Sequence, residues 1–293
     1  MAWNKAKPAL LAVGMYDGTV GIMDVRSRNK KFIYQSTVRE SKHTDPVWEI
    51  RWDEVDMSFT SISVDGRVCN WKLKKSKLDC ETIAELRMTG QACDDEPSAA
   101  VLTGLGNGLS FDLSPHDPDM YLVGTEEGMI LKCSRFLSSN AVMTYPGHSM
   151  AVYAVRWNRF NPDLFASASA DWTVKLWRSE APSGPLCSFD LGQAVGDIDW
   201  SPVSGSVLAA VNSEGSIFVL DLDTNRYKEV THQKVIPKGK LTRVAFNRHE
   251  PILVVGDDRG SISCLKLSPN LRKGEGDPAT EKAKVGKIID ALS

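Results

Sequence analysis

Short runs of alternating or β-branched hydrophobic residues, separated by tight polar turns, recur along the whole chain. Six segments share the order strand, turn, strand, and each turn has Asp, Glu or Arg followed by Gly or, once, by Trp. The first turn residues are Asp17, Asp65, Glu127, Asp171, Glu214 and Arg259. Such turns between alternating hydrophobic residues are typical of β-hairpins. The pattern therefore predicts β-structure up to a short C-terminal tail.

The hairpins recur at a regular spacing. Successive turns lie 48, 62, 44, 43 and 45 residues apart, and four of these intervals are near the ~40–45 residues of a four-stranded propeller blade. A hydrophobic residue ends the preceding strand 13 or 14 positions before each turn, at Trp3, Trp52, Leu113, Trp157, Trp200 and Phe246. Because a blade buries its faces only against other blades, we predict an all-β propeller with six visible blades.

The best-formed repeat indicates the propeller type. Residues 147–177 begin with Gly-His, have Ala-Asp in the turn and end with Leu-Trp, which is typical of WD repeats. We expect the propeller to occupy residues 1–268 as part of a seven-bladed ring. Trp3 already ends a first strand, and the last repeat stops after its third strand. The chain is therefore expected to be an N-terminally truncated propeller.

The interval of 62 residues indicates an insertion at 74–109. It holds a predicted outer strand at 78–86, the acidic DDEP at 94–97 and the glycine cluster GLGNG at 104–108. No helix pattern follows the glycines, which argues against a dinucleotide-binding loop and favours a turn or bulge. Most of the insertion is expected to be surface loop, the kind of segment that often carries function.

The last 25 residues, 269–293, are predicted to be a linker and a short amphipathic helix. Asp277 and Pro278 suit the helix cap and first turn. Val285, Ile288, Ile289 and Leu292 then follow at helical spacing as one hydrophobic stripe. An isolated helix of this length is marginal in water. The stripe is therefore expected to pack on the propeller or on a partner, and the sequence leaves both open.

The composition argues against nucleic-acid binding, a zinc site and a membrane-spanning segment. The chain has 35 Lys and Arg against 37 Asp and Glu, a net charge of -2, without the basic excess of a nucleic-acid-binding domain. Its six cysteines lack the paired spacing of a zinc site, and we expect reduced thiols, no metal and no cofactor. Neither a signal peptide nor a hydrophobic run of ~18 residues is present, so an intracellular protein with no membrane partner is expected.

Two sets of residues resemble a hydrolase triad by type. They are His43, Ser61 or Ser63, and Asp65, and then His148, Ser167 or Ser169, and Asp171, with Trp71 and Trp177 six positions after the two aspartates. An enzyme needs one such site, whereas a repeat that stabilises its own turn needs one in each blade. We therefore interpret both sets as structural hydrogen-bond networks from Asp to His to Ser to Trp. No catalytic residue is predicted.

A protein-binding face is predicted where the turns gather. Trp48 and Tyr153 each lie five positions after the His that opens their repeat, and Trp172 takes a turn position where the other repeats have Gly. Arg51 and Arg156 follow Trp48 and Tyr153 by three positions. Large aromatic residues with nearby arginines are the usual anchors of protein interfaces. Packing of the same aromatics on neighbouring loops is the alternative.

Several segments narrow the family. LLAVGMYDGTVGIMDVR, HTDPVWEIRW, YLVGTEEGMILKCS, ASADWTVKLW and VVGDDRGSISCLKLSPNLRK resemble the C-terminal half of axonemal dynein intermediate chains, in particular those of the outer arm. The resemblance covers residues from about 3 to 272. It implies a seven-bladed propeller that binds the tail of a dynein heavy chain, pairs with a second intermediate chain and associates with microtubules through the complex.

The resemblance also implies a non-enzymatic scaffold subunit of the ciliary or flagellar axoneme. The long N-terminal region that binds light chains in this family has no counterpart in the sequence, so light-chain binding is not expected of these residues. The alternative is a generic WD-repeat adaptor outside cilia that uses the same aromatic face on a peptide.

Overall fold

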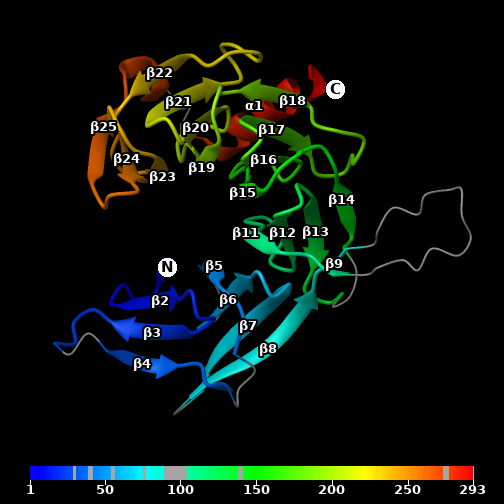
Figure 1. The fold of residues 1–293 in the computed structure, drawn as a ribbon. Coiled ribbons are helices and arrows are strands. Elements are labelled where there is room, and N and C mark those ends of the chain that lie inside the picture. Colours follow the sequence, from blue (N-terminus) through cyan, green and yellow to red (C-terminus); the bar gives the residue numbers. More distant parts are fainter. Residues whose placement is uncertain are drawn as a thin grey trace, which may run out of the picture. The chain divides into compact units, whose positions relative to one another are not determined.

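The computed structural model covers residues 1–293, and the structure describes residues 1–28, 31–38, 42–53, 57–74, 77–88, 104–137, 141–272 and 277–292. Nearly all regular structure in these ranges is antiparallel β-sheet, and the chain separates into two compact units. The first comprises 1–111, 119–127 and 131–143, and the second 112–118, 128–130 and 144–293. The all-β, WD-repeat prediction is confirmed, and each repeat forms one sheet (Figure 1).

The first two repeats form four-stranded sheets within the first unit. The first sheet comprises β1 (Ala2–Trp3), β2 (Leu10–Gly14), β3 (Val20–Asp24) and β4 (Phe32–Gln35), and the second comprises β5 (Val47–Trp52), β6 (Ser58–Ser63), β7 (Arg67–Lys74) and β8 (Lys77–Glu85). The predicted outer strand of the insertion is β8. After it, β9 (Arg87–Met88) and β10 (Gly104–Leu105) pair as a small ribbon. The acidic DDEP segment lies outside the described residues.

The third repeat contributes residues to both units. Its sheet comprises β11 (Gly108–Leu113), β12 (Met120–Thr125), β13 (Ile130–Ser134) and β14 (Met143–Tyr145). Gly108, from the glycine cluster, begins β11 in van der Waals proximity to Ile62 and Leu86, where an added Cβ would lie 2.5 Å from the Ile62 side chain. This glycine therefore permits a close packing approach rather than ligand binding.

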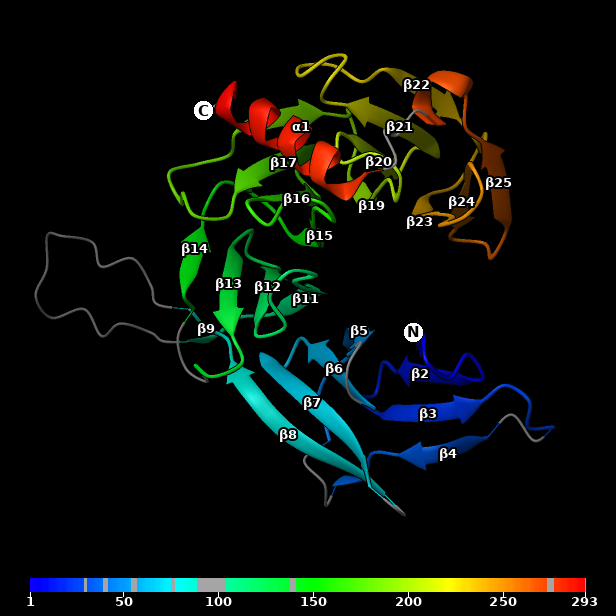
Figure 2. The same cartoon turned by 180° about the vertical axis from the view of Figure 1, so that it is seen from behind.

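The second unit contains the last three repeats (Figure 2). Their strands are β15 (Val152–Trp157), β16 (Leu164–Ser169), β17 (Thr173–Arg178) and β18 (Cys187–Asp190); β19 (Val195–Trp200), β20 (Val207–Asn212), β21 (Ser216–Asp221) and β22 (Thr231–Lys234); and β23 (Leu241–Phe246), β24 (Ile252–Asp257) and β25 (Ile262–Lys266). The last sheet has three strands among the described residues, as the sequence predicts. A 3₁₀ turn (Pro269–Arg272) and helix α1 (Pro278–Asp290) follow.

The first strand of each sheet ends at the hydrophobic residue that the sequence analysis used to mark the end of that strand. All six marker residues, from Trp3 to Phe246, are the last residues of the first strands of their sheets. In β6, β16 and β20 every residue is buried, because a middle strand of a blade is covered on both faces. For this reason these strands contain mainly small and hydrophobic residues at every position and do not alternate between hydrophobic and polar residues.

Helix α1 packs on its own chain. Asp277 caps the helix by accepting a hydrogen bond from the Ala279 N–H. Val285, Ile288 and Ile289 are buried in a core cluster with residues of β16, β17 and β20, and Leu292 packs against that cluster (Figures 1 and 2). The predicted partner-helix stripe is therefore covered by the second unit. None of the described helices has the length and hydropathy of a membrane-spanning segment.

Candidate protein-interaction site

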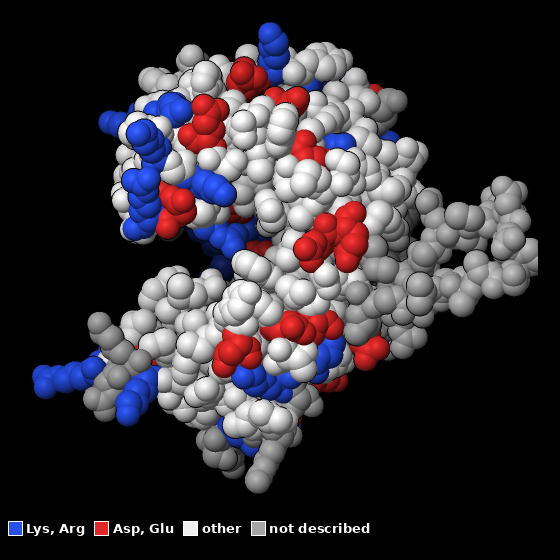
Figure 3. Space-filling model, viewed as in Figure 1, with Lys and Arg blue, Asp and Glu red and all other residues white. Residues whose placement is uncertain are grey.

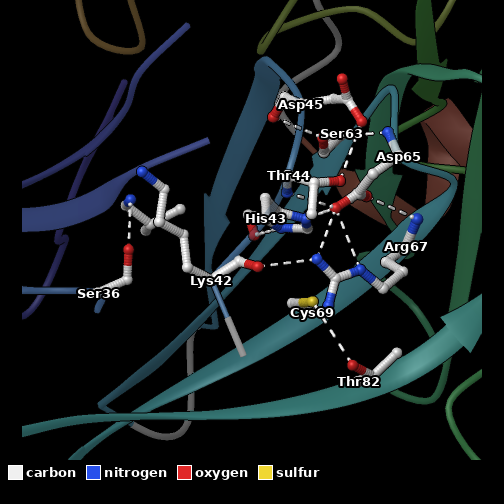
Figure 4. A network of polar contacts seen from close by, with 12 residues as sticks. Ser36, Lys42, His43, Thr44, Asp45, Ser63, Asp65, Arg67, Cys69 and Thr82 are labelled. Carbon is white, nitrogen blue, oxygen red and sulfur yellow. Dashed lines mark hydrogen bonds and ion pairs between the residues drawn. The ribbon is translucent and has the colours of Figure 1, made fainter. Parts of the chain in front are cut away.

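The triad-like residues of the second blade form one chain of hydrogen bonds. Figure 4 shows the part of it around His43 and Asp65. His43 Nδ1 lies 2.9 Å from Asp65 Oδ2, and His43 Nε2 lies 2.8 Å from Ser61 Oγ. Trp71 donates its indole N–H to the same Ser61 oxygen at 2.7 Å. All of these contacts join β6, β7 and the segment before β5 inside one blade. They have the order that the sequence predicts.

The fourth blade repeats the arrangement. His148 lies 2.8 Å from Asp171 through Nδ1 and 2.6 Å from Ser167 Oγ through Nε2. Trp177 donates its indole N–H to Ser167 at 2.8 Å. Ser167 and Trp177 are fully buried, so no water or substrate reaches the serine oxygen. The arrangement can satisfy buried polar groups, and it presents no accessible nucleophile.

The structure also distinguishes between the two serines that the sequence leaves open in each blade. Ser63 and Ser169 are outside the His–Trp connection. Their hydroxyls donate to the Asp45 and Met150 carbonyl oxygens at 2.9 and 3.0 Å and accept the Asp65 and Asp171 backbone N–H groups. They hold the turn that carries the aspartate.

The pKa values of the two histidines shift in opposite directions. Burial lowers the pKa of His43, but hydrogen bonds and charges from Asp65 and Cys69 outweigh burial and raise that pKa to about 9. Burial dominates at His148, where it lowers the pKa, and the positive charge of Lys175 adds to that lowering. Cys69 and Lys175 occupy corresponding positions, opposite Ser61 and Ser167.

Two of the predicted interface aromatics project from β-bulges. The pairing of β5 with β6 shifts by one residue between Val47 and Glu49, and that of β15 with β16 shifts between Val152 and Ala154. The extra residues are Trp48 and Tyr153, whose exposed fractions are 48% and 43%. A bulge re-aims a side chain, and here it places a large aromatic in solvent on an otherwise buried strand.

Trp172 is held in an unusual backbone conformation. Its φ is 74°, and it is the only residue other than glycine with positive φ in the part of the chain that the structure describes. The corresponding turn positions of the other repeats are Gly18, Gly66, Gly128, Gly215 and Gly260, all with positive φ. A bulky residue there is a clear outlier, and strain of this kind gathers at functional sites. Trp172 is 49% exposed.

The two predicted arginines of this face already form ion pairs within the chain. Arg156 is an almost buried side chain paired with Asp197 at 3.2 Å. Arg51 is partly covered and pairs with Glu49 at 2.8 Å. Their part in the interface stays a prediction. Arg156 on β15 reaches Asp197 on β19 of the next blade, whereas Arg51 meets Glu49 on its own strand β5.

Carboxylates on the first strands join successive blades through hydrogen bonds to backbone N–H groups, and no sequence motif predicts these contacts. Glu49 accepts the Phe111 backbone N–H at 2.9 Å, and Asp112 accepts that of Trp157 at 2.9 Å. Asp197 and Asp199 accept the N–H groups of Val244 and Phe246 at 3.2 and 2.9 Å. Each bond joins the first strand of one blade to the first strand of the next. The signal in the sequence that could have predicted these contacts is an Asp or Glu within the first strand of a repeat.

Charge is uneven along the chain. Residues 226–272 carry ten Lys and Arg against four Asp and Glu, although the whole chain has a net charge of -2. Figure 3 shows Lys and Arg side chains gathered where β22 of the fifth blade and β23 to β25 of the last blade lie. Charge complementarity acts mainly on association rate and specificity. This blade is therefore suited to an acidic partner surface.

Comparison with known proteins agrees with the architecture. The family model described as "WD domain, G-beta repeat" matches residues 139–178, the fourth blade. The chain is 44% identical over 297 residues to "Dynein intermediate chain 2, ciliary" of Heliocidaris crassispina, covering 96% of this chain and 42% of that protein.

Two further relatives are similar at the same level. Identity is 41% over 295 residues to "Dynein, 78 kDa intermediate chain, flagellar outer arm" of Chlamydomonas reinhardtii, covering 96% of this chain and 43% of that protein. Identity is 42% to "Dynein axonemal intermediate chain 1" of Bos taurus, covering 97% and 42%. The chain thus spans about two fifths of the length of these relatives. Over that part, its WD repeats and its sequence show that it belongs to the axonemal dynein intermediate chain family.

Proposed function

We propose that the chain is a non-enzymatic scaffold subunit of an axonemal, outer-arm dynein. In this role it binds the tail of a dynein heavy chain and a second intermediate chain, and it associates with microtubules through the assembled complex in cilia or flagella. The observation that carries the proposal is the 44% identity over 96% of the chain to a ciliary dynein intermediate chain.

The two hydrogen-bond networks support a role without catalysis. Each serine oxygen accepts a tryptophan N–H inside the blade, and catalytic triads are recognised by geometry that includes access to a substrate. A repeated and buried arrangement fits stabilisation of the fold. The motor activity then belongs to a partner, and this chain supplies positioning.

In the second unit, Tyr153 and Trp172 support a protein contact. They are half-exposed aromatics at positions where a β-bulge and a strained turn hold them outward. Aromatic anchors of this kind carry a large share of interface energy. We assign them as the principal contact residues of this unit. In the first unit, Trp48 occupies the same bulge position as Tyr153.

The assignment to dynein is tested in a ciliated cell. The native protein is tagged, axonemes are extracted with high salt, and the extract is sedimented and analysed by mass spectrometry. Heavy chains and a second intermediate chain in one large particle are expected. Recovery of the tagged protein in a small cytosolic pool without them would overturn the dynein role in favour of an adaptor outside cilia.

The contact surface is tested with Trp172→Gly in the same assay. This variant installs the residue of the other five turns, so it keeps or raises stability by about 1 kcal/mol while it removes the aromatic. We expect at least about tenfold weaker recovery of the partners, as for a hot-spot residue. Tyr227→Ala is the matched control, since Tyr227 is an exposed aromatic (79%) elsewhere in the same unit. Equal losses for both variants would remove Trp172 from the interface.

A further inference from the structure

Three Ser-Pro dipeptides occur in the chain, and the structure places them in different surroundings. They are Ser114-Pro115, Ser201-Pro202 and Ser268-Pro269. Ser114 and Ser201 directly follow β11 and β19, which are the first strands of their sheets. Ser268 lies at the end of the last blade, between β25 and the 3₁₀ turn (Pro269–Arg272). The same dipeptide can therefore be compared at three sites of one molecule.

The hydroxyl groups of the first two dipeptides are used inside the blades. The Ser114 hydroxyl oxygen accepts two backbone N–H groups of the turn that follows it, at 3.3 and 3.2 Å. The Ser201 hydroxyl oxygen does the same in its own turn, with both distances at 3.3 Å. Both serines are buried, with exposed fractions of 8% and 2%. These hydroxyl groups stabilise the turn after a first strand and are closed to another protein.

Ser268 differs from the other two serines in exposure and in bonding. It is exposed, and its hydroxyl group has no hydrogen-bond partner among the residues that the structure describes. Its carbonyl oxygen accepts the Leu271 N–H at 3.1 Å, and Leu271 is buried in a core cluster of the last two blades. A residue before proline favours an extended backbone. Ser268 is therefore presented on an anchored turn with a free hydroxyl group.

A guanidinium group lies beside this serine. Arg272 donates its Nε–H to the Leu267 carbonyl oxygen at 2.7 Å, and that carbonyl belongs to the peptide bond between Leu267 and Ser268. The other N–H groups of the guanidinium have no partner among the described residues, and arginine binds phosphate through paired hydrogen bonds. Lys266 is a second, exposed cation two positions before the serine. A phosphate on Ser268 thus has a cationic partner within one turn.

We propose that Ser268 is a phosphorylation site of a proline-directed serine/threonine kinase and that Arg272 binds the phosphate. Kinases of this class act on an accessible Ser or Thr that is followed by Pro, and Ser268 alone of the three dipeptides meets both conditions. The Ser268 hydroxyl oxygen attacks the γ-phosphorus of ATP, a new O–P bond forms, and the bond from that phosphorus to the β-phosphate oxygen breaks. ADP leaves, and the hydroxyl proton passes to the catalytic base of the kinase.

The phosphate changes the charge of a basic region. Residues 226–272 carry ten Lys and Arg against four Asp and Glu, and a phosphoserine adds close to two negative charges at neutral pH. The modification therefore removes about a third of the positive excess. Because charge complementarity acts mainly on association rate, phosphorylation slows association with an acidic surface. The phosphorylation itself does not depend on which partner the chain binds.

The site is tested by incubating the whole chain with ATP, Mg²⁺ and an active mitogen-activated protein kinase. Peptide mass spectrometry follows phosphate at each serine, and a synthetic peptide of each dipeptide with its flanking residues gives the rate without the fold. The ratio of the two rates is expected to be at least about tenfold higher for Ser268 than for Ser114 and Ser201, because a buried serine reacts only when its turn opens.

Three variants test the recognition of this dipeptide. Ser268→Ala and Pro269→Ala are each expected to abolish phosphorylation at this position. Ser261→Ala, at an exposed serine of the same blade that no proline follows, is the matched control and should leave it unchanged. A thermal melt confirms that each variant is folded. The proposal is overturned if the rate ratio does not favour Ser268, or if Pro269→Ala is phosphorylated as fast as the parent chain.

The role of Arg272 is tested on the phosphorylated chain by phosphorus NMR titration. A cation that binds the phosphate favours its doubly charged form, so the second pKa of the phosphate should lie below that of the free phosphopeptide. In Arg272→Gln this pKa is expected to return toward the value of the phosphopeptide. Lys282→Gln, at an exposed position of α1, is the control. Equal titrations of the parent chain and Arg272→Gln would overturn the assignment of Arg272 as the phosphate-binding residue.

Discussion

Single residues decide the chemistry of each network. The second and fourth blades use the same His, Ser, Asp and Trp atoms, yet His43 and His148 have pKa shifts of opposite direction. Asp65 and Cys69 raise the pKa of His43, whereas burial, with a contribution from Lys175, lowers that of His148. Cys69 and Lys175 each lie opposite the network serine of their blade. Arg67 adds a second contrast, because it binds Asp65 at 2.7 Å where Thr173 contacts Asp171.

Replacing Cys69 with Ser is expected to lower the pKa of His43. The substitution removes a negative charge that favours the imidazolium, while Asp65 and Arg67 still face the ring network. NMR titration of the histidine ring signals measures the effect. In the parent chain His43 should titrate near pH 9 and His148 below 6.5. An unchanged His43 titration in the variant, with Cys133→Ser as control, would contradict the account.

The pKa of His148 also makes stability depend on pH. Its folded pKa lies below the ordinary value of 6.5, so the folded chain binds fewer protons than the unfolded chain in acid. The contribution of this residue is present above pH 6.5 and is lost as pH falls below it. Urea unfolding at several pH values should show a loss of stability as the pH falls below 6.5, and this loss should be smaller in His148→Gln. A parallel loss in both proteins would refute the assignment.

Ser167→Ala should destabilise the chain by about 1–3 kcal/mol, because the buried Trp177 N–H and the His148 ring nitrogen both lose a partner. Urea unfolding measures the change in free energy. Ser188→Ala, at an exposed position of the same blade, is the control and should stay within about 0.5 kcal/mol of the parent. Equal unfolding curves for the two variants would mean that the network contributes no stability.

At the scale of elements, the sequence pattern predicts that helix α1 forms, but it does not predict which part of the chain the helix packs against. Helix α1 has the cap and stripe that its sequence predicts. Its location depends on a buried carboxylate, since Glu281 accepts the Gly205 N–H at 2.8 Å and lies 3.3 Å from Ser204 Oγ. Lys284 adds an ion pair with Asp223 at 3.1 Å. These contacts attach the helix to the loop between β19 and β20 through Glu281 and to the turn after β21 through Lys284.

Ile288→Ala is expected to destabilise the isolated chain by about 2–5 kcal/mol, because Ile288 is buried in the shared core cluster. Amide hydrogen exchange should then rise in 278–290 and in β20. Lys282→Ala, at an exposed position of the same helix, provides the control. Unchanged stability together with weaker partner binding would indicate that the stripe serves a partner instead.

At the scale of the whole molecule, blades are joined through their first strands. Asp197 pairs with Arg156 at 3.2 Å, lies 3.7 Å from Arg243 and accepts the Val244 N–H. One carboxylate in the fifth blade thus meets both neighbouring blades. Trp200 reinforces the connection by donating its indole N–H to the Arg156 carbonyl at 3.1 Å.

Asp197→Asn should lower stability by about 3–5 kcal/mol, because it leaves the buried charge of Arg156 without its anionic partner. Limited proteolysis should then cut sooner between the fifth and sixth blades. Asp190→Asn, at an exposed position of the second unit, is the control. In Arg156→Met the effect of Asp197→Asn should shrink, and additive losses would show that the two side chains are not coupled.

The sequence by itself determined the strand ends, the turns, the WD-repeat type and the helix. These depend on local rules, namely alternation, glycine or acidic turn chemistry and helical spacing, which residues a few positions apart satisfy together. The tertiary structure alone decided which serine completes each network, that Arg156 pairs with Asp197 of the next blade, and that α1 covers its own blades. Those outcomes depend on residues some 20 to 80 positions apart, whose proximity is set by strand pairing and blade packing and is absent from any local pattern.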